Sequence, residues 1–144
     1  MRRVCVLGCG RLGQIIADGL YSGKVEGCQL AGVMDGNGMA AEKAAGKFQC
    51  KACTGIEELM ALNPDYVVEA ATADAVKACA LAVLSGGAEL ICLSVGAFYD
   101  HAFRQQAAAA AVQHGTKVHL ASGVLGGFDF MTAAAMYGQA ETVL

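Results

Sequence analysis

A short apolar run near the start of the chain leads into the pattern G-x-G-x-x-G, and this feature constrains the fold most. The run covers residues 4–7, and the glycines are Gly8, Gly10 and Gly13. A strand, a glycine turn and a helix in this order are typical of a pyrophosphate-binding βαβ unit. Gly8 permits a sharp turn, Gly10 leaves space for a pyrophosphate, and Gly13 lets the helix pack closely on the strand.

The helix that follows the glycine loop predicts an anion site at its N-terminus. The backbone N–H groups of Arg11, Leu12 and Gly13 have no acceptor within the helix, and the helix dipole favours phosphate charge. This helix is expected over residues 11–21. Its apolar spacing predicts a stripe that packs on the sheet, formed by Leu12, Ile15, Ile16 and Leu20.

An aspartate follows the glycine loop at the distance typical of dinucleotide-binding units, about 20 residues further along. This residue, Asp35, ends the second apolar run. Its carboxylate can accept hydrogen bonds from both hydroxyls of an adenosine ribose, and it repels a 2′-phosphate. The turn at residues 36–38 contains no arginine that could hold such a phosphate. The sequence therefore predicts NAD, with NADP as the alternative because Lys43 and Lys47 lie close by in the sequence.

Apolar runs and helical patterns alternate along the chain. This alternation predicts the α/β class, as a Rossmann doubly wound parallel six-stranded sheet with helices on both faces and strand order 3-2-1-4-5-6. The expected strands are residues 3–7, 28–34, 48–52, 66–68, 89–94 and 116–120. The other expected helices are residues 39–46, 56–62, 73–84, 100–114 and 130–137, and residues 141–144 resemble the start of a further strand.

Ligands of open parallel sheets bind beyond the carboxyl ends of the strands. The small residues after the fourth strand leave room for the central ribose and nicotinamide, and the segment after the fifth strand should border the nicotinamide. After the sixth strand, a glycine-rich connection implies close backbone approach or unusual dihedrals; a strained turn between domains is the alternative. The candidate cofactor-binding residues in these three places are Ala70, Ala71 and Thr72; Ser94, Val95 and Gly96; and Ser122 and Gly123.

The composition of the chain limits the classes of partner that it is expected to bind. The formal net charge is -3, without a basic stripe, so a nucleic-acid partner is not expected. No apolar run reaches the roughly 18 residues of a membrane span. Charged residues make up only 16% of the chain, against about 25% in typical domains. We read this as surface that another domain or subunit covers, which favours a homo-oligomer; exposed alanine is the alternative explanation.

The seven cysteines are scattered and odd in number, which favours reduced thiols and a cytoplasmic location. Cys50 and Cys53 form a C-x-x-C pattern. It does not open a long helix and lacks further ligands at zinc spacing, so neither a redox nor a metal site is expected. The three histidines are His101, His114 and His119, and no nucleophilic triad is expected around them.

Four segments together resemble the NAD-binding half of L-aspartate dehydrogenases. They are GCGRLG at residues 8–13, VVEAATADAV at 67–76, LSVGAFYD at 93–100 and SGVLGGFD at 122–129. The resemblance covers essentially the whole chain. The glycine loop alone would equally suit homoserine dehydrogenase or dihydrodipicolinate reductase, which share this domain type.

The resemblance implies NAD(P)-dependent oxidative deamination of L-aspartate, with hydride transfer between the substrate Cα and nicotinamide C4, and a link to NAD biosynthesis. It also implies a dinucleotide-binding domain over residues 1–138, with residues 139–144 beginning a substrate domain that holds the catalytic histidine and most contacts to an aspartate-like substrate. We therefore expect this chain to bind NAD(H) with negligible turnover. A stand-alone NAD(H)-binding or redox-sensing module is the competing hypothesis.

Overall fold

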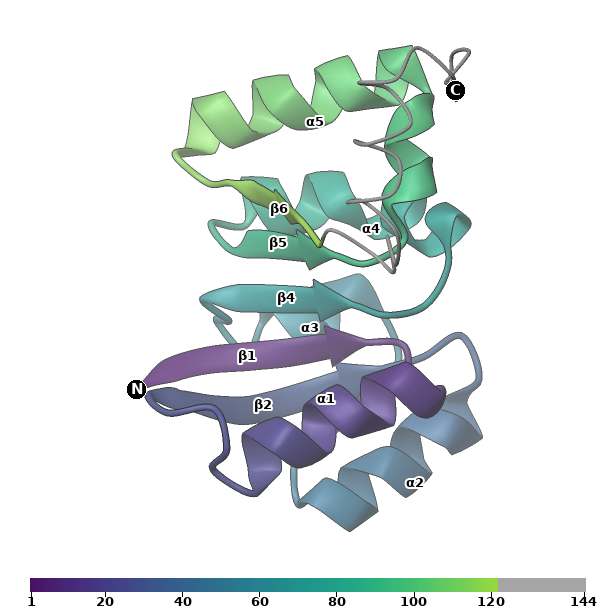
Figure 1. The fold of residues 1–144 in the computed structure, drawn as a ribbon, viewed down its shortest axis with the longest axis vertical. Coiled ribbons are helices and arrows are strands. Elements are labelled where there is room, and N and C mark those ends of the chain that lie inside the picture. The colour runs from purple at the N-terminus through teal and green to yellow at the C-terminus, as the bar shows by residue number, and fades with distance from the viewer. Residues whose placement is uncertain (122–144) are drawn as a thin grey trace, which may run out of the picture.

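The computed structural model describes residues 1–121, which form one parallel sheet covered by helices (Figure 1). The strand order is β3-β2-β1-β4-β5-β6, and each neighbouring pair is parallel. The predicted α/β class and the predicted order are both confirmed. The strands are β1 (Arg2–Leu7), β2 (Cys28–Met34), β3 (Lys51–Cys53), β4 (Tyr66–Glu69), β5 (Glu89–Cys92) and β6 (Val118–Leu120).

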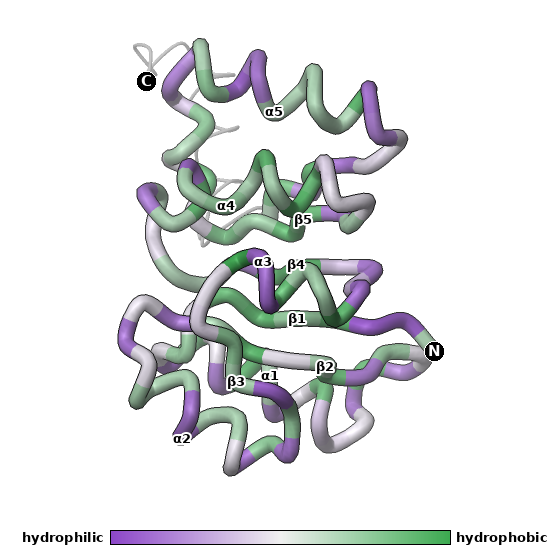
Figure 2. Tube along the Cα trace, turned by 180° about the vertical axis from the view of Figure 1, so that it is seen from behind, coloured by the Kyte–Doolittle hydropathy of each residue, from purple (hydrophilic) through white to green (hydrophobic). Residues whose placement is uncertain are grey.

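The helices lie in two layers about the sheet. Helices α1 and α2 cover one face at β1, β2 and β3, whereas α3 and α4 cover the other, and α5 packs on α4 toward the β6 edge (Figures 1 and 2). None of the helices up to residue 121 is both long and apolar enough to cross a membrane. The bounds are α1 (Arg11–Tyr21), α2 (Gly38–Phe48), α3 (Ile56–Met60), α4 (Ala73–Ser85), α5 (His101–His114) and a 3₁₀ helix, η1 (Val95–Tyr99).

Strand β1 is buried on both faces, so it contributes to two hydrophobic cores. Val4 and Val6 pack in the core under α1 and α2, while Cys5 and Leu7 pack in the core under α3 and α4. Burying a side chain of this size contributes roughly 1.5–3 kcal/mol. Figure 2 shows hydrophobic residues concentrated along β1, β5 and α4. A central strand held from both sides gives the glycine loop that follows it a rigid base.

The prediction of which α1 residues face the sheet was wrong in part. Leu20 is buried, but Leu12 is 49% and Ile15 60% exposed. The buried face instead includes Gly13 and Ala17. Gly13 packs so closely on Gly8 that no side chain fits there, and the larger Leu12 and Ile15 side chains lie on the outward face of the helix.

The third predicted strand, residues 48–52, was also displaced. Phe48 ends α2 and is 2% exposed, and β3 begins only at Lys51. Gln49 adopts a left-handed conformation at the end of the helix, with φ of 51°. An aromatic residue suits a buried helix face as well as a strand, and periodicity cannot separate the two in so short a run.

Side chains cap the starts of two helices. The Thr72 hydroxyl accepts a hydrogen bond of 3.2 Å from the Ala75 N–H at the start of α4. At the start of α5, Asp100 accepts one of 3.1 Å from the Phe103 N–H. Gly115 ends α5 in the left-handed region, as expected for a C-terminal glycine. The predicted elements at 130–137 and 141–144 lie outside the described residues.

Candidate functional site

The loops after β1, β2 and β4 meet at the carboxyl edge of the sheet and enclose a cavity of about 510 Å³. That volume is in the usual range of small-molecule sites, roughly 300–1,000 Å³. The sheet order reverses at β1 and β4, and such a switch point is where open α/β sheets bind ligands. The predicted site residues that line this cavity are Gly8, Gly10, Asp35, Ala70, Ala71 and Thr72.

Two glycines of the loop are required by packing. Gly8 has φ of +102°, and a Cβ there would lie 2.5 Å from the Ala70 carbonyl oxygen. A Cβ at Gly13 would lie 1.8 Å from the Gly8 carbonyl oxygen. No side chain fits either place, so the loop is held tightly between β1, α1 and the end of β4.

The middle glycine is different, because a Cβ on Gly10 would meet nothing within 4 Å among residues 1–121. Gly10 precedes α1 with extended dihedrals, and no side chain caps this helix. The N–H groups of the first turn of a helix have no acceptor within the helix, and they suit an anion that approaches the helix N-terminus. The backbone at Gly10 thus fits the close approach of a pyrophosphate, and the residues present fit a dinucleotide.

Asp35 lies at the end of β2 and contacts the glycine loop directly. Its Oδ2 accepts a hydrogen bond of 2.7 Å from the Cys9 N–H, and its Oδ1 accepts one of 2.8 Å from the Asn37 N–H. Each carboxylate oxygen can accept more than one hydrogen bond. The carboxylate is therefore fixed in orientation and keeps capacity to accept from a ligand that enters the cavity.

The cysteines near the site are poor nucleophiles. Burial, together with the negative charge of Asp35, raises the pKa of Cys9 to about 11. Burial and the neighbouring Cys53 raise the pKa of Cys50 to about 11 as well. A reactive thiol needs the opposite shift. All seven thiols are free, and between residues 1 and 121 no three His, Cys, Asp or Glu side chains gather as a metal site would require.

A buried glutamate that was not predicted as a site residue joins β4 to β5. Glu69 is fully buried, and its Oε1 accepts hydrogen bonds of 2.7 Å from the Ala71 N–H and 2.8 Å from the Ser94 hydroxyl. Its Oε2 accepts from the Ser94 and Leu93 N–H groups at 2.9 and 3.2 Å. The available sequence signal was a charged residue that directly follows a continuous apolar run.

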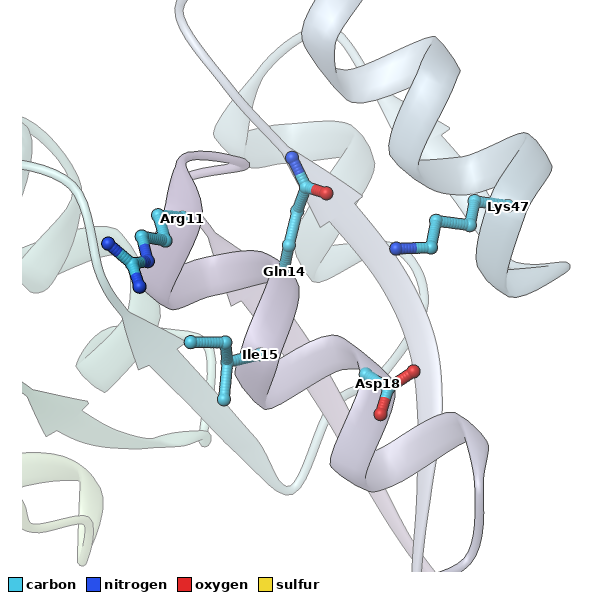
Figure 3. Close-up of a pocket in the computed structure, with 5 residues that line it drawn as sticks. All are labelled: Arg11, Gln14, Ile15, Asp18 and Lys47. Atoms are coloured by element: carbon cyan, nitrogen blue, oxygen red, sulfur yellow. The ribbon is translucent and has the colours of Figure 1, made fainter.

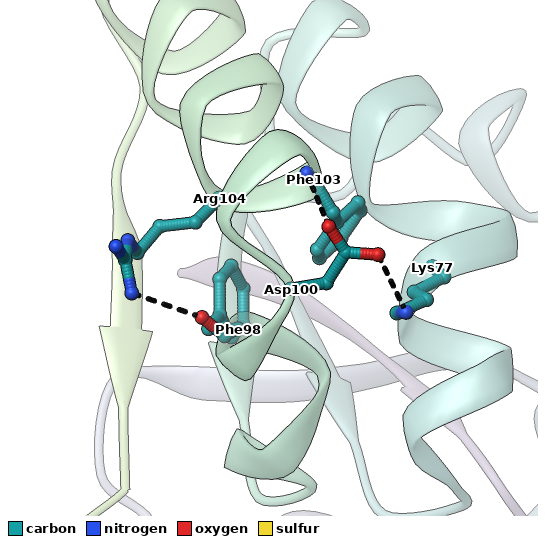
Figure 4. Close-up of polar contacts among 5 residues, drawn as sticks. All are labelled: Lys77, Phe98, Asp100, Phe103 and Arg104. Carbon is teal, nitrogen blue, oxygen red and sulfur yellow. Dashed lines mark hydrogen bonds and ion pairs between the residues drawn. The ribbon is translucent and has the colours of Figure 1, made fainter.

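The segment after β5 forms η1, which the sequence did not predict. Asp100 at its end also pairs with Lys77 of α4 at 2.9 Å, and the Arg104 guanidinium donates to the Phe98 carbonyl at 3.3 Å (Figure 4). The Lys77 ammonium and the Phe103 N–H lower the pKa of Asp100. These contacts fasten the segment that begins at Ser94 to α4 and α5.

Several predicted site residues lie away from the cavity. Ser94, Val95 and Gly96 do not line it; Ser94 is connected to it through Glu69, which also accepts a hydrogen bond from Ala71. Leu12 is exposed, Gly13 is packed against Gly8, and neither lines the cavity. Ser122 and Gly123 lie outside the described residues.

Arg11 borders a different hollow, on the outer side of α1 (Figure 3). This hollow of about 550 Å³ is also lined by Gln14, Ile15, Asp18 and Lys47. Lys47 comes from α2 and points its amino group toward α1, and that group lies 4.7 Å from the Phe48 ring centroid. Neither Lys47 nor Lys43 lines the cavity beside Asp35.

Comparison with known proteins agrees with this geometry. A family model described as homoserine dehydrogenase, NAD binding domain, matches residues 8–121. L-aspartate dehydrogenase of Methanococcus maripaludis strain C7 is 28% identical over 144 residues, which is 100% of this chain and 54% of that protein. L-aspartate dehydrogenase 2 of Bordetella pertussis strain Tohama I is 32% identical over 141 residues, 98% of this chain and 52% of that protein. The chain thus spans about half the length of the curated relatives it matches.

The solved structures support the fold. The WlbA dehydrogenase from Bordetella pertussis, in complex with NADH and UDP-GlcNAcA, superposes with a TM-score of 0.76 at 17% identity, covering 94% of this chain and 42% of that one. The resemblance to the cofactor half of L-aspartate dehydrogenases is confirmed, and so is NAD as the cofactor class. The chain belongs to the family of homoserine dehydrogenase NAD-binding domains.

Proposed function

We propose that the chain binds NAD(H) in the cavity between the ends of β1, β2 and β4. The adenosine ribose hydroxyls donate to Asp35, and the pyrophosphate lies against Gly10 and the first turn of α1. The nicotinamide half extends toward Ala71 and the segment that begins at Ser94. The observation that carries this proposal is the open space over Gly10 next to a carboxylate already fixed by the loop.

NAD is proposed over NADP because of the charge beside the ribose. A 2′-phosphate would approach the Asp35 carboxylate and meet no cation among the cavity-lining residues of the described part of the chain, residues 1–121. The two lysines that kept NADP as an alternative do not face this place, and Lys47 contacts the Phe48 ring instead.

We propose that this chain takes part in the activity for which its relatives are named, that of L-aspartate dehydrogenase. The reaction is oxidative deamination of L-aspartate with hydride transfer to nicotinamide. Bound NAD would supply the hydride acceptor. This chain's own residues would bind the cofactor, orient it and keep its nicotinamide at the carboxyl edge of the sheet. None of the three histidines lines the cavity, and His119 instead pairs with Glu89 at 2.6 Å. We therefore propose that substrate contacts and proton transfer come from outside residues 1–121.

Titration of the chain with NADH and NADPH, followed by cofactor fluorescence, tests the proposal. We expect saturable NADH binding that is at least about tenfold tighter than NADPH binding, since one uncompensated charge contact costs on the order of 1.4 kcal/mol or more. Tighter binding of NADPH would refute the assignment of Asp35, and binding of neither would refute the site.

We also propose that the chain forms a homo-oligomer, because Leu12 and Ile15 leave an apolar surface on α1. Analytical ultracentrifugation tests this: a monomer at all concentrations would contradict it.

A further inference from the structure

Glu69 is a buried carboxylate surrounded by hydrogen-bond donors. Besides the Ala71, Leu93 and Ser94 N–H groups and the Ser94 hydroxyl, the Cys92 thiol lies 3.4 Å from Oε2. Burial and the charge of Glu69 raise the pKa of Cys92 to about 12, so the thiol keeps its proton and donates. Both carboxylate oxygens therefore act as acceptors.

The sheet itself does not need this carboxylate. Strands β4 and β5 are already paired through their backbones, and the Leu93 N–H also donates to the Glu69 carbonyl at 3.2 Å. Burying a charge is costly, and an apolar side chain of similar volume often serves stability as well or better. The carboxylate instead reaches past the ends of the strands, to the backbone of Ala71 and to Ser94.

These two contacts belong to the two loops of the carboxyl edge that are expected beside the nicotinamide. Ala71 lines the cavity, whereas Ser94 directly precedes η1. Glu69 itself is fully buried and touches neither solvent nor the cavity. Any influence it has on a ligand must pass through the positions of these loops.

We propose that Glu69 is a positioning residue, which fixes the nicotinamide side of the cofactor site by joining the loop after β4 to the segment after β5. The inference rests on the proposed function. It predicts that loss of the carboxylate affects the nicotinamide half of the ligand and spares the adenosine half, which the glycine loop and Asp35 hold.

Glu69→Gln is the direct test, because the amide replaces one of the two acceptor oxygens with an NH₂ donor. In either orientation of the amide, this NH₂ group faces a backbone N–H, that of Ala71 or those of Leu93 and Ser94. Binding of NADH is compared with binding of ADP-ribose, which lacks the nicotinamide. We expect the NADH affinity of the variant to fall about tenfold, with ADP-ribose affinity within about twofold of the unsubstituted chain. Bound NADH should also lose part of its fluorescence enhancement.

Ser94→Ala is the milder second variant, since it removes only one hydroxyl donor and keeps the carboxylate. It should shift NADH affinity in the same direction by about threefold. Glu89→Gln is the matched control: it makes the same change at the opposite end of β5, and it should alter neither affinity.

Equal losses of NADH and ADP-ribose binding in Glu69→Gln, or unchanged binding of both, would overturn the inference while leaving the proposed function intact. If Glu69→Gln does not fold, unchanged NADH binding by Ser94→Ala would overturn it as well. Failure of the unsubstituted chain to bind NADH would overturn the proposed function, and this inference with it.

Discussion

The Asp35 carboxylate accepts a hydrogen bond of 2.7 Å from the backbone N–H of Cys9, which ties the end of β2 to the glycine loop. Two elements that a dinucleotide must contact together are thus fixed relative to each other without a ligand. This preorganisation lowers the entropic cost of binding.

Replacement of Asp35 by alanine should weaken NADH binding by roughly 1.5–3 kcal/mol, the usual contribution of hydrogen bonds to a charged group. The preference for NADH over NADPH should shrink at the same time, because the repulsive charge is gone. Fluorescence titration with both cofactors measures the two effects. Glu42→Ala removes an equal charge from the exposed side of α2 and serves as the control; an equal loss in that variant would contradict a specific role for Asp35.

Gly10→Ala should separate binding from folding. Among residues 1–121, apart from its two neighbours in the chain, the new Cβ meets no atom within 4 Å. The melting temperature should therefore stay within a few degrees of the unsubstituted chain, whereas NADH affinity should drop at least about tenfold. Gly8→Ala should unfold at a clearly lower temperature, because strain of roughly 1–3 kcal/mol adds to a clash with Ala70. Thermal melts and titrations on both variants give the comparison. Normal NADH affinity in Gly10→Ala would show that no phosphate approaches that backbone.

Phe48→Ala should destabilise the chain by roughly 3–5 kcal/mol, since Phe48 is a large side chain buried in the core under α1 and α2. Chemical denaturation measures the change. Val112→Ala on α5, where the side chain is 85% exposed, should cost less than about 0.5 kcal/mol. Similar costs for both variants would contradict the placement of Phe48 in the core.

The Asp65 carboxylate should make the stability of the fold sensitive to acid. Its pKa is lowered by the Arg3 N–H, which donates to Oδ2 at 2.7 Å, and by the Arg2 guanidinium at 2.8 Å from Oδ1. A carboxyl whose pKa is lower in the folded state stabilises the fold above its unfolded pKa of about 3.9, and that stabilisation is lost as pH falls through the folded value. Asp65→Asn should therefore lower the melting temperature at pH 7 and make little difference once the pH is below both pKa values. A constant gap at every pH would refute this.

The fold could be predicted from the sequence because its signals are local. The alternation of apolar runs with helical patterns predicted the strand order once the glycine loop had identified the unit. The displaced third strand shows the limit. Phe48 is compatible with a helix or a strand, and the tertiary contacts that place it under α1 leave no local signature.

The site was predictable where a residue's role depends on its own backbone or charge, as for Gly8, Gly10 and Asp35. It was not predictable where the role depends on partners far along the chain. The role of Glu69 depends on its hydrogen bonds with Ser94, 25 residues further along the chain. The outward orientation of Leu12 and Ile15 follows from the tight packing of Gly13 against Gly8. Such relationships exist only once the strands are paired.

NADH binding in the cavity beside Gly10 and Asp35 can be followed residue by residue. Backbone amide chemical shifts of the ¹⁵N-labelled chain, recorded with increasing NADH, locate the bound cofactor. We expect the largest shifts on Gly10, Arg11, Gly36 and Ala71. Largest shifts around the groove between α5 and β6, where Phe98, Arg104 and Leu120 line a separate hollow, or no shifts at all, would contradict it.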